Sequence, residues 1–121
     1  MAAKDELGRR GEDTAAEYLQ REHGMVVLSR NWRCRAGELD IVATDRERRL
    51  VVVCEVKTRS GTRFGEPAEA VTAYKVRRIR GLAREWMAAH RLPWAEVRFD
   101  VVAVLMPPHG PATLVHYPAA F

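Results

Sequence analysis

The chain has 121 residues, of which 47% are hydrophobic and 30% are charged, and its formal net charge at pH 7 is +4. That length suits one core, so we expect residues 1–121 to form a single domain. No apolar run approaches the roughly 20 residues of a membrane span, and the opening MAAKDELGRRGED carries no apolar leader. Two cysteines without CxxC spacing argue against a disulfide framework or zinc pattern, so we expect reduced thiols, a cytoplasmic protein and no membrane partner. The positive charge suits a polyanionic partner such as nucleic acid, and equally a basic surface that binds nothing.

Hydrophobic periodicity and turn residues divide the chain into two helices and five strands. The connections between the first three strands are short, which favours an antiparallel meander. The order αβββαββ therefore predicts an α/β sandwich in which helices flank a mixed sheet of about five strands. The predicted helices cover 5–22 and 72–90, and the predicted strands cover 25–34, 38–45, 49–58, 95–105 and 112–117.

The predicted helices carry further signals at particular positions. Gly8 and Gly11 weaken the first helix by roughly 1 kcal/mol each relative to alanine, which indicates close approach to another segment. Thr72 is the expected N-cap of the second helix. The apolar stripe of that helix is expected to comprise Val71, Ile79, Leu82, Trp86 and Ala89.

Aromatic and titratable residues elsewhere predict packing and pairing. Trp32, Trp86 and Trp94 are expected in the core, and base stacking is the alternative for Trp32 because arginines that include Arg35 flank it. Asp100 is expected to pair with a neighbouring cation. The four histidines are scattered along the chain and predict neither a triad nor a zinc site.

The segment VVVCEVKTR begins as an apolar strand and then becomes charged. Alternate residues of a strand face the same way, so Glu55 and Lys57 lie side by side on the face that Val51 and Val53 occupy. A lone buried charge is costly, so such groups are paired, bound to metal or hydrated. An apolar face that turns charged at its end indicates a sheet face opening into a cleft.

A second acidic pair lies in GELDIVA, where Glu38 and Asp40 are expected on one strand face and Leu39 and Ile41 on the other. Counting back from the hairpin turn, Asp40 falls opposite about residue 54. Two carboxylates converging on one point repel unless a cation or a proton lies between them. Oxygen ligands without a nearby histidine suit Mg²⁺ or Mn²⁺. The alternatives are salt bridges of Asp40 and Glu55 with Lys57 and an arginine, and a surface role for Glu38.

The position of Lys57 beside two acids gives it a chemical role. Its ammonium can hold an attacking water or neutralise charge that builds on a phosphate. Phosphodiester hydrolysis needs a hard cation, a positioned water and such a positive group.

The segments GELDIV and VCEVKTR resemble the PD-(D/E)xK nuclease superfamily, with Asp40 as its acid and Glu55-Val56-Lys57 as its ExK element. GRRGED, RSGTRFGEPAEAV, Lys75 and RFDVV extend the likeness along the chain. Together they resemble the YraN family of small bacterial proteins, which is similar to archaeal Holliday-junction resolvases. This resemblance implies a restriction-endonuclease-like fold and a Mg²⁺ site that Glu12 also reaches. Leu39 stands where the superfamily has proline.

Two functions from different classes fit the sequence. The first is a Mg²⁺- or Mn²⁺-dependent endonuclease that cuts branched or junction DNA during repair or recombination, plausibly as a homodimer. The second is a non-catalytic module that binds DNA or a protein partner on a nuclease scaffold. The expected catalytic residues are Asp40, Glu55, Lys57 and Glu12, of which the three acids are expected to hold the metal. The expected DNA-binding residues are Arg59, Arg63, Lys75 and Arg35, with a solvated helix face as the alternative for Lys75.

Overall fold

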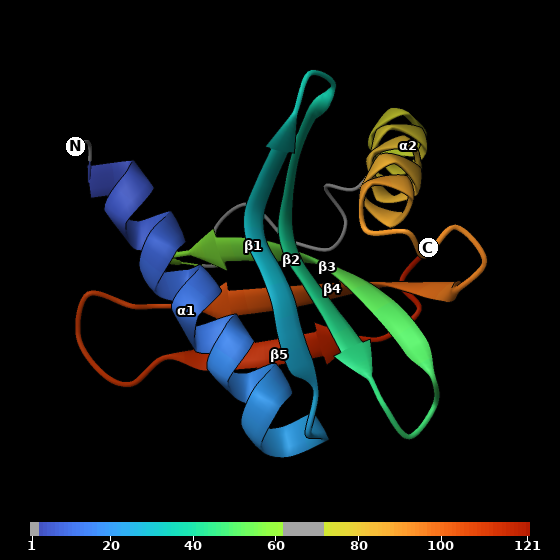
Figure 1. Ribbon diagram of the computed structural model, residues 1–121. Coiled ribbons are helices and arrows are strands. Elements are labelled where there is room, and N and C mark those ends of the chain that lie inside the picture. The colour runs from blue at the N-terminus through green and yellow to red at the C-terminus, as the bar shows by residue number, and fades with distance from the viewer. Residues whose placement is uncertain (1–2, 62–71) are drawn as a thin grey trace.

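The computed structural model of the protein describes residues 3–61 and 72–121, with side chains from residue 6 onward. Arg63 and Val71 lie outside the described residues. The predicted element order is confirmed (Figure 1). The elements are α1 (Ala3–His23), β1 (Val26–Cys34), β2 (Gly37–Asp45), β3 (Leu50–Arg59), α2 (Ala73–Ala89), β4 (Glu96–Leu105) and β5 (Thr113–Tyr117).

The five strands form one mixed sheet in the order β1-β2-β3-β4-β5. β1, β2 and β3 form the expected antiparallel meander, and β5 is antiparallel to β4. β3 and β4 are parallel, from Leu50 beside Glu96 to Arg59 beside Leu105. Parallel neighbours need a crossover connection, and α2 lies in the segment that makes it. The predicted α/β class is therefore correct.

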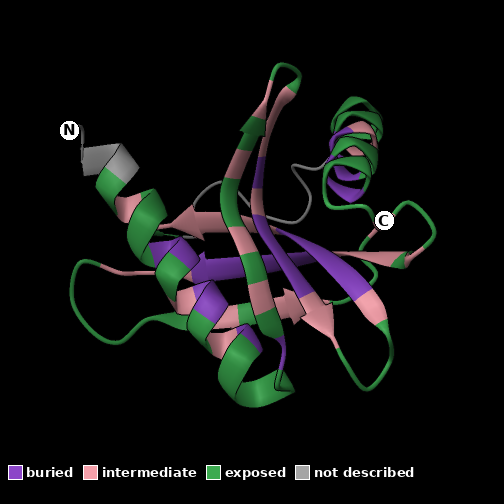
Figure 2. Cartoon of the chain, viewed as in Figure 1, coloured by how far each residue is buried: buried purple, intermediate pink, exposed green. Residues whose placement is uncertain are grey.

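The two helices cover opposite faces of the sheet, and β3 shows why. Val52 and Cys54 pack in the core cluster under α1, whereas Val51 and Val53 pack in the cluster under α2. Figure 2 shows the buried residues concentrated in the middle strands and on the inner side of α1. Because strand faces alternate, Glu55 and Lys57 fall on the face that α2 covers, beyond the end of the apolar cluster.

Close approach of α1 to the sheet depends on one glycine. A Cβ placed at Gly11 would lie 2.6 Å from Cγ2 and 2.8 Å from Cβ of Thr58 on β3, distances that overlapping atoms cannot sustain. The prediction for Gly11 is therefore confirmed. The prediction for Gly8 is wrong, because a Cβ there would meet nothing within 4 Å.

The second helix begins and packs largely as predicted. The Thr72 hydroxyl accepts the N–H of Lys75 at 3.2 Å and caps α2. Ile79, Leu82 and Trp86 are buried, and Trp86 Nε1 donates to the Ser29 hydroxyl at 3.0 Å. The stripe differs from expectation at its end, where Ala89 is exposed and two other residues are buried, Ala83 and Met87.

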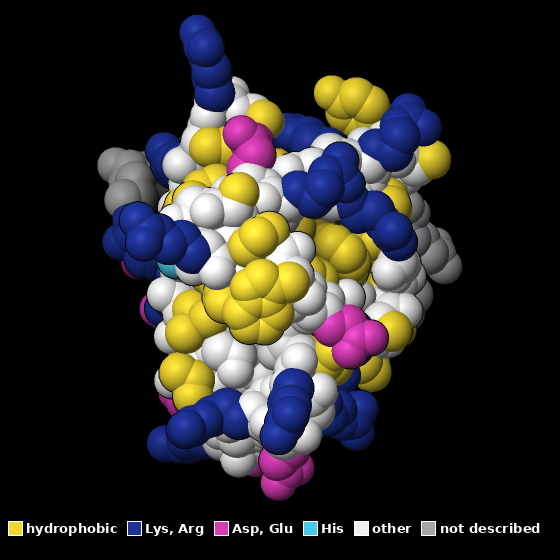
Figure 3. All heavy atoms as spheres, turned by 45° about the vertical axis from the view of Figure 1, so that its right-hand side comes forward, with side chains coloured by type: hydrophobic (Ala, Val, Ile, Leu, Met, Phe, Trp, Pro, Cys, Tyr) yellow, Lys and Arg dark blue, Asp and Glu magenta, His cyan; other side chains and the backbone are white. Residues whose placement is uncertain are grey.

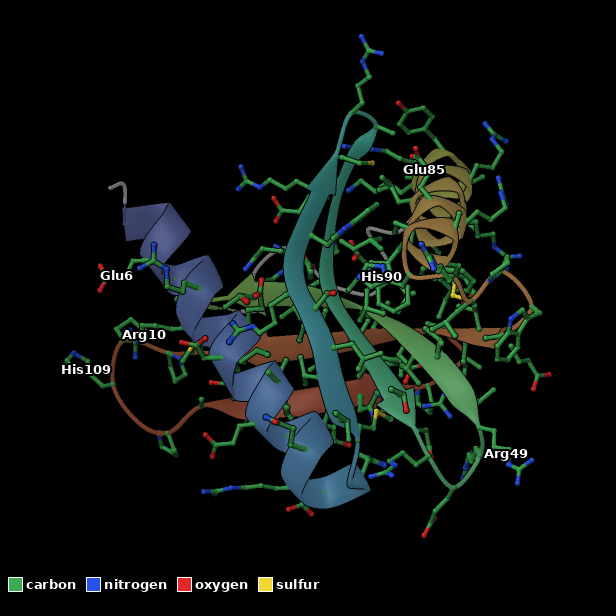
Figure 4. All side chains as sticks on the ribbon, in the orientation of Figure 1. Glu6, Arg10, Arg49, Glu85, His90 and His109 are labelled. Atoms are coloured by element: carbon green, nitrogen blue, oxygen red, sulfur yellow. The ribbon has the colours of Figure 1, made fainter. Side chains whose placement is uncertain are left out.

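Residues near the C-terminal end of α2 make further contacts, and Trp94 lies outside the core. His90, which follows the end of α2, stacks on Trp86 with ring centroids 4.0 Å apart. Cys34 Sγ at the end of β1 donates to Glu85 Oε2 on α2 at 3.3 Å. Figure 4 labels His90 and Glu85. The prediction that all three tryptophans pack is wrong for Trp94, which is 78% exposed on the turn before β4.

A buried network joins β4, β5 and α1. Asp100 is fully buried and accepts two hydrogen bonds from Arg98 at 2.8 Å, as expected for pairing with a cation. His116 Nε2 lies 2.7 Å from Asp100 Oδ2, and the Tyr18 hydroxyl lies 3.1 Å from His116 Nδ1 and 2.9 Å from His23 Nε2. Two of the histidines scattered in sequence therefore meet in space. Burial alone would raise the pKa of Asp100, but hydrogen bonds from His116, Arg98 and Ala119 lower it to about 2.

In the described part of the chain, neither helix has the length and apolar character that crossing a membrane requires.

Candidate active site

The site lies where two neighbouring strands separate. β2 pairs with β3 from Asp45 beside Leu50 to Ile41 beside Cys54. Beyond that pair, β2 continues to Gly37 against β1, and β3 continues to Arg59 against β4. We call this separation the β2–β3 fork; its first residues are Asp40 and Glu55. The predicted register, with Asp40 opposite about residue 54, was therefore one position short.

The fork also breaks the alternation of β2. Ile41 packs in the cluster under α1, but Leu39 packs in the cluster under α2. The prediction that these two residues share a face is therefore wrong. Its physical reason is that β2 loses its β3 partner between them, so the strand is free to turn at Asp40.

The carboxylate of Asp40 takes the place of a strand partner at the fork. Its Oδ2 accepts the backbone N–H of Val56 at 2.9 Å, so a side chain satisfies a donor that the separating strand leaves unpaired. Burial raises the pKa of Asp40 to about 6, and the charge of Glu12 adds to the rise. The Val56 hydrogen bond and the charge of Lys57 act in the opposite direction.

Glu55 faces the same fork with an acceptor that no described group satisfies. Its Oε2 is buried and, of the buried side-chain polar atoms in the described residues, it is the one without a hydrogen-bond partner. Burial and the charge of Asp40 raise the pKa of Glu55 to about 7, against an opposing effect of Lys57. Within the described ranges Lys57 forms no ion pair with either acid, yet its charge lowers the pKa of both.

Glu12 lies near the cluster but is bound to other partners. It is 7% exposed, and its Oε1 accepts from Arg30 Nε at 3.1 Å, Arg30 Nη2 at 3.0 Å and Asn31 Nδ2 at 2.8 Å. Asn31 has φ of +53°, which agrees with an irregular strand at this position. Glu12 thus lies close enough for its charge to raise the pKa of Asp40, while its Oε1 accepts hydrogen bonds from Arg30.

A cleft of about 180 Å³ opens on the α2 face of the fork. Glu55 and Lys57 line it from β3, Glu38 lines it from β2, and Lys75 and Arg78 line it from α2. Glu38 also pairs with the exposed Arg33 at 2.7 Å, so both its surface role and its place near the acids are seen. Lys75, expected either to contact DNA or to lie on a solvated helix face, is an exposed residue that lines this cleft, and its contact with DNA stays a prediction. The cleft thus has acids on its floor and a basic wall on α2.

Arg78 is a cleft residue that the sequence did not single out. A Cβ at Gly37 would lie 2.7 Å from Arg78 Nη2, so the glycine that starts β2 makes room for this guanidinium. Helical spacing could have identified Arg78 from the sequence, because it follows Lys75 by three residues and shares its helix face.

The other predicted DNA contacts lie outside the cleft lining. Arg59 ends β3 rather than standing on a loop, and its carbonyl accepts the N–H of Met106 at 2.8 Å. Arg35 is exposed at the turn between β1 and β2. Among residues 3–61 and 72–121, no group of three His, Cys, Asp or Glu side chains is arranged to hold a metal ion. The cluster is built around two carboxylates, Asp40 and Glu55, with Glu12 and Glu38 beside them.

Fold and site together define an α/β protein with a mixed five-stranded sheet and a carboxylate–lysine cluster where two inner strands separate. The family model described as "Uncharacterised protein family UPF0102" matches residues 11–104, and the chain belongs to this family. The resemblance to YraN proteins is therefore confirmed at the level of the family.

Bacterial relatives match the chain from end to end. A UPF0102 protein of Frankia alni is 54% identical over 121 residues, which cover 100% of this chain and 98% of the relative. A UPF0102 protein of Kineococcus radiotolerans is 52% identical over 117 residues, covering 96% and 93%. One of Nocardia farcinica is 51% identical over 118 residues, covering 98% and 91%.

Proposed function

We propose that the protein hydrolyses DNA phosphodiester bonds at the β2–β3 fork with the help of a bound divalent cation. The observation that carries this proposal is the unsatisfied, buried Oε2 of Glu55 beside the Asp40 carboxyl. Two acids with raised pKa values and one acceptor without a donor destabilise the fold unless another group, such as a cation, binds them. The resemblance to PD-(D/E)xK nucleases supports the same conclusion.

The residues at the fork fit Mg²⁺ or Mn²⁺. Asp40 and Glu55 would hold the cation, because both present oxygen, the donor that hard cations prefer. Mg²⁺ is commonly bound through one or two carboxylates together with water and substrate phosphate, so two protein ligands suffice. When bound, such a cation polarises a phosphoryl oxygen and lowers the pKa of a coordinated water. The hydrogen bonds that Glu12 accepts from Arg30 and Asn31 end on its Oε1, so Glu12 would join them through Oε2 or after releasing these donors.

The chain's own basic residues bind and orient the phosphate. Lys57 shares the strand face of Glu55 and lines the cleft, so its ammonium neutralises negative charge that develops at the reacting phosphate. Arg78 and Lys75 stand across the cleft on α2; a guanidinium binds phosphate through two parallel hydrogen bonds and an ammonium as a point charge. The acids would repel DNA without the cation, so we expect productive binding to require it.

Branched or junction DNA is the proposed substrate. The cleft is small, and the described residues that line it are ionic groups and aliphatic side chains, which bind phosphate rather than read base edges. Such a site selects the shape of DNA. Cutting both strands of a junction calls for two sites, so the proposal includes a homodimer.

The test is cleavage of supercoiled, single-stranded and four-way-junction DNA with Mg²⁺, Mn²⁺ or EDTA. Cleavage of the junction with metal, none with EDTA and at least a 100-fold loss in Lys57→Ala are expected. Arg49→Ala removes the same charge at the far hairpin, labelled in Figure 4, and should retain the wild-type rate. Equal cleavage by wild type and Lys57→Ala would show a contaminating nuclease and refute the proposal.

A second candidate is a module that binds DNA or a protein partner without cutting. The engagement of Glu12 Oε1 by Arg30 and Asn31 favours it, because one oxygen of the third acid implied by the nuclease resemblance is already bound. Binding of four-way-junction DNA by pure protein, with no cleavage under either metal, would favour the module over the enzyme.

A further inference from the structure

A groove of about 380 Å³ lies between α2 and β4, apart from the acidic cleft. α2 does not cover β4 completely, so Val97 and Phe99 remain half-buried and form its floor with Met87. In Figure 3, hydrophobic side chains gather on this side of the molecule with Lys and Arg side chains beside them. The floor thus offers apolar surface to a partner.

The rim of this α2–β4 groove is positively charged. Arg80 and Arg84 line it, and among the described residues no acidic side chain does. In the described part of the chain Arg84 has no ion-pair partner, and the Arg80 guanidinium carbon lies 5.3 Å from the centroid of the Phe99 ring. Two arginines without acids suit a negatively charged partner.

Trp94 is an exposed aromatic residue in the segment that borders the groove. It stands between Pro93 and Ala95, which both line the groove, and it is 78% exposed. Exposed tryptophan and arginine next to an apolar hollow are the residue types that dominate binding energy at protein interfaces.

Charge and ring geometry decide between possible occupants. A two-fold contact with a second copy would place the same basic rim against itself, which is repulsive. Stacking of a base on Phe99 is disfavoured because this ring already contacts Phe121, at 5.4 Å between ring centroids, and Arg80. We propose that the α2–β4 groove binds an acidic peptide segment of a partner protein, with one or two large apolar side chains seated on Met87, Val97 and Phe99.

The first experiment selects ligands from a random twelve-residue peptide library displayed on phage. Enriched peptides are expected to combine several Asp or Glu residues with Leu, Ile or Phe. The leading peptide, made synthetically, should change the emission of Trp94, which is far more exposed than Trp86. Replacing its apolar residues by serine should abolish binding, because charge alone does not fill the groove.

Surface variants assign the binding to the groove. Arg84→Glu should lower the affinity for the peptide at least 10-fold, because the change reverses a charge on the rim. Arg77→Glu makes the same change on α2 outside the lining and should leave the affinity within about twofold, the control for long-range charge. Both sites are exposed, so both variants should retain the wild-type far-UV circular dichroism spectrum.

Five results would overturn the proposal. Enrichment of no peptide, or of peptides without acids, would do so, as would equal loss in Arg84→Glu and Arg77→Glu. A Trp94 emission that changes with protein concentration, together with a dimer in light scattering, would assign the groove to a second copy. If oligothymidylate quenched the Trp94 emission and Arg84→Glu removed that quenching, the α2–β4 groove would be assigned to nucleic acid.

Discussion

Replacing Glu55 by glutamine is expected to remove a loss of stability that the metal-free protein suffers between pH 5 and pH 8. Burial and the charge of Asp40 raise the pKa of Glu55 from its ordinary 4.5 to about 7. The folded protein therefore holds this proton more tightly than the unfolded chain does. The stabilisation from a raised carboxyl pKa is fully present below the unfolded value and is lost as pH rises through the folded value.

The size of the effect follows from the shift. One pKa unit corresponds to 1.36 kcal/mol, so a rise from 4.5 to about 7 means that ionised Glu55 weakens the fold by roughly 3 kcal/mol at pH 8. At pH 5 folded Glu55 is protonated and the corresponding effect is below about 1 kcal/mol. Glutamine has its own cost, because its amide also lacks a partner, but that cost does not change with pH. Between the two pH values the wild type should therefore lose about 2 kcal/mol more than Glu55→Gln.

Urea unfolding in EDTA at pH 5 and pH 8 measures this difference, with far-UV circular dichroism as the signal. Glu47→Gln is the control, because Glu47 is an exposed acid on the turn between β2 and β3. It should show the pH dependence of the wild type. Equal pH dependence in wild type and Glu55→Gln would mean that Glu55 ionises freely, and the raised pKa attributed to burial beside Asp40 would be wrong.

Three further predictions concern the metal, the α1 contact and the buried network. Mn²⁺ at 100 times its dissociation constant should stabilise the wild type by about 2.7 kcal/mol at pH 8 and have little effect on Glu55→Gln, as thermal unfolding would show; equal shifts would contradict a site at the fork. Gly11→Ala should destabilise the fold by about 1–3 kcal/mol because of overlap with Thr58, and Thr58→Ala should recover part of that loss in urea unfolding; no loss would mean that α1 is not tightly seated. Asp100→Asn should cost about 3–5 kcal/mol at pH 7, since it leaves the Arg98 charge buried without its partner. With the pKa of Asp100 lowered to about 2, its contribution should be present above about pH 4 and lost towards pH 2, and an acid titration of stability unchanged by Asp100→Asn would contradict it.

The fold was predictable because its signals are local. Alternating and helical periodicities gave all seven elements with small boundary differences, and the short loops gave the meander. The parallel pairing of β3 and β4 was not specified beyond a mixed sheet. The parallel pairing depends on the path of the crossover segment that contains α2, and no local sequence pattern specifies that path. Trp94 was misplaced for a similar reason, because its exposure depends on how far α2 covers β4.

The site was predictable where strand alternation applies and not beyond it. Glu55 and Lys57 share a face as the period of two requires, and the hairpin count brought Asp40 within one position. The break in alternation at Asp40 arises from loss of a strand partner, which the sequence does not mark. The engagement of Glu12 by Arg30 is a long-range contact between α1 and β1, and only the packed structure reveals it.

The cleft is built from two separate segments of the chain. Its acids and Lys57 come from a single hairpin, closed by the short turn between Asp45 and Leu50, so they meet through a short loop. Lys75 and Arg78 arrive on a separate crossover helix. Substitutions on α2 can therefore change the basic side of the cleft while the carboxylates stay as they are, so the two sets of charges can vary independently.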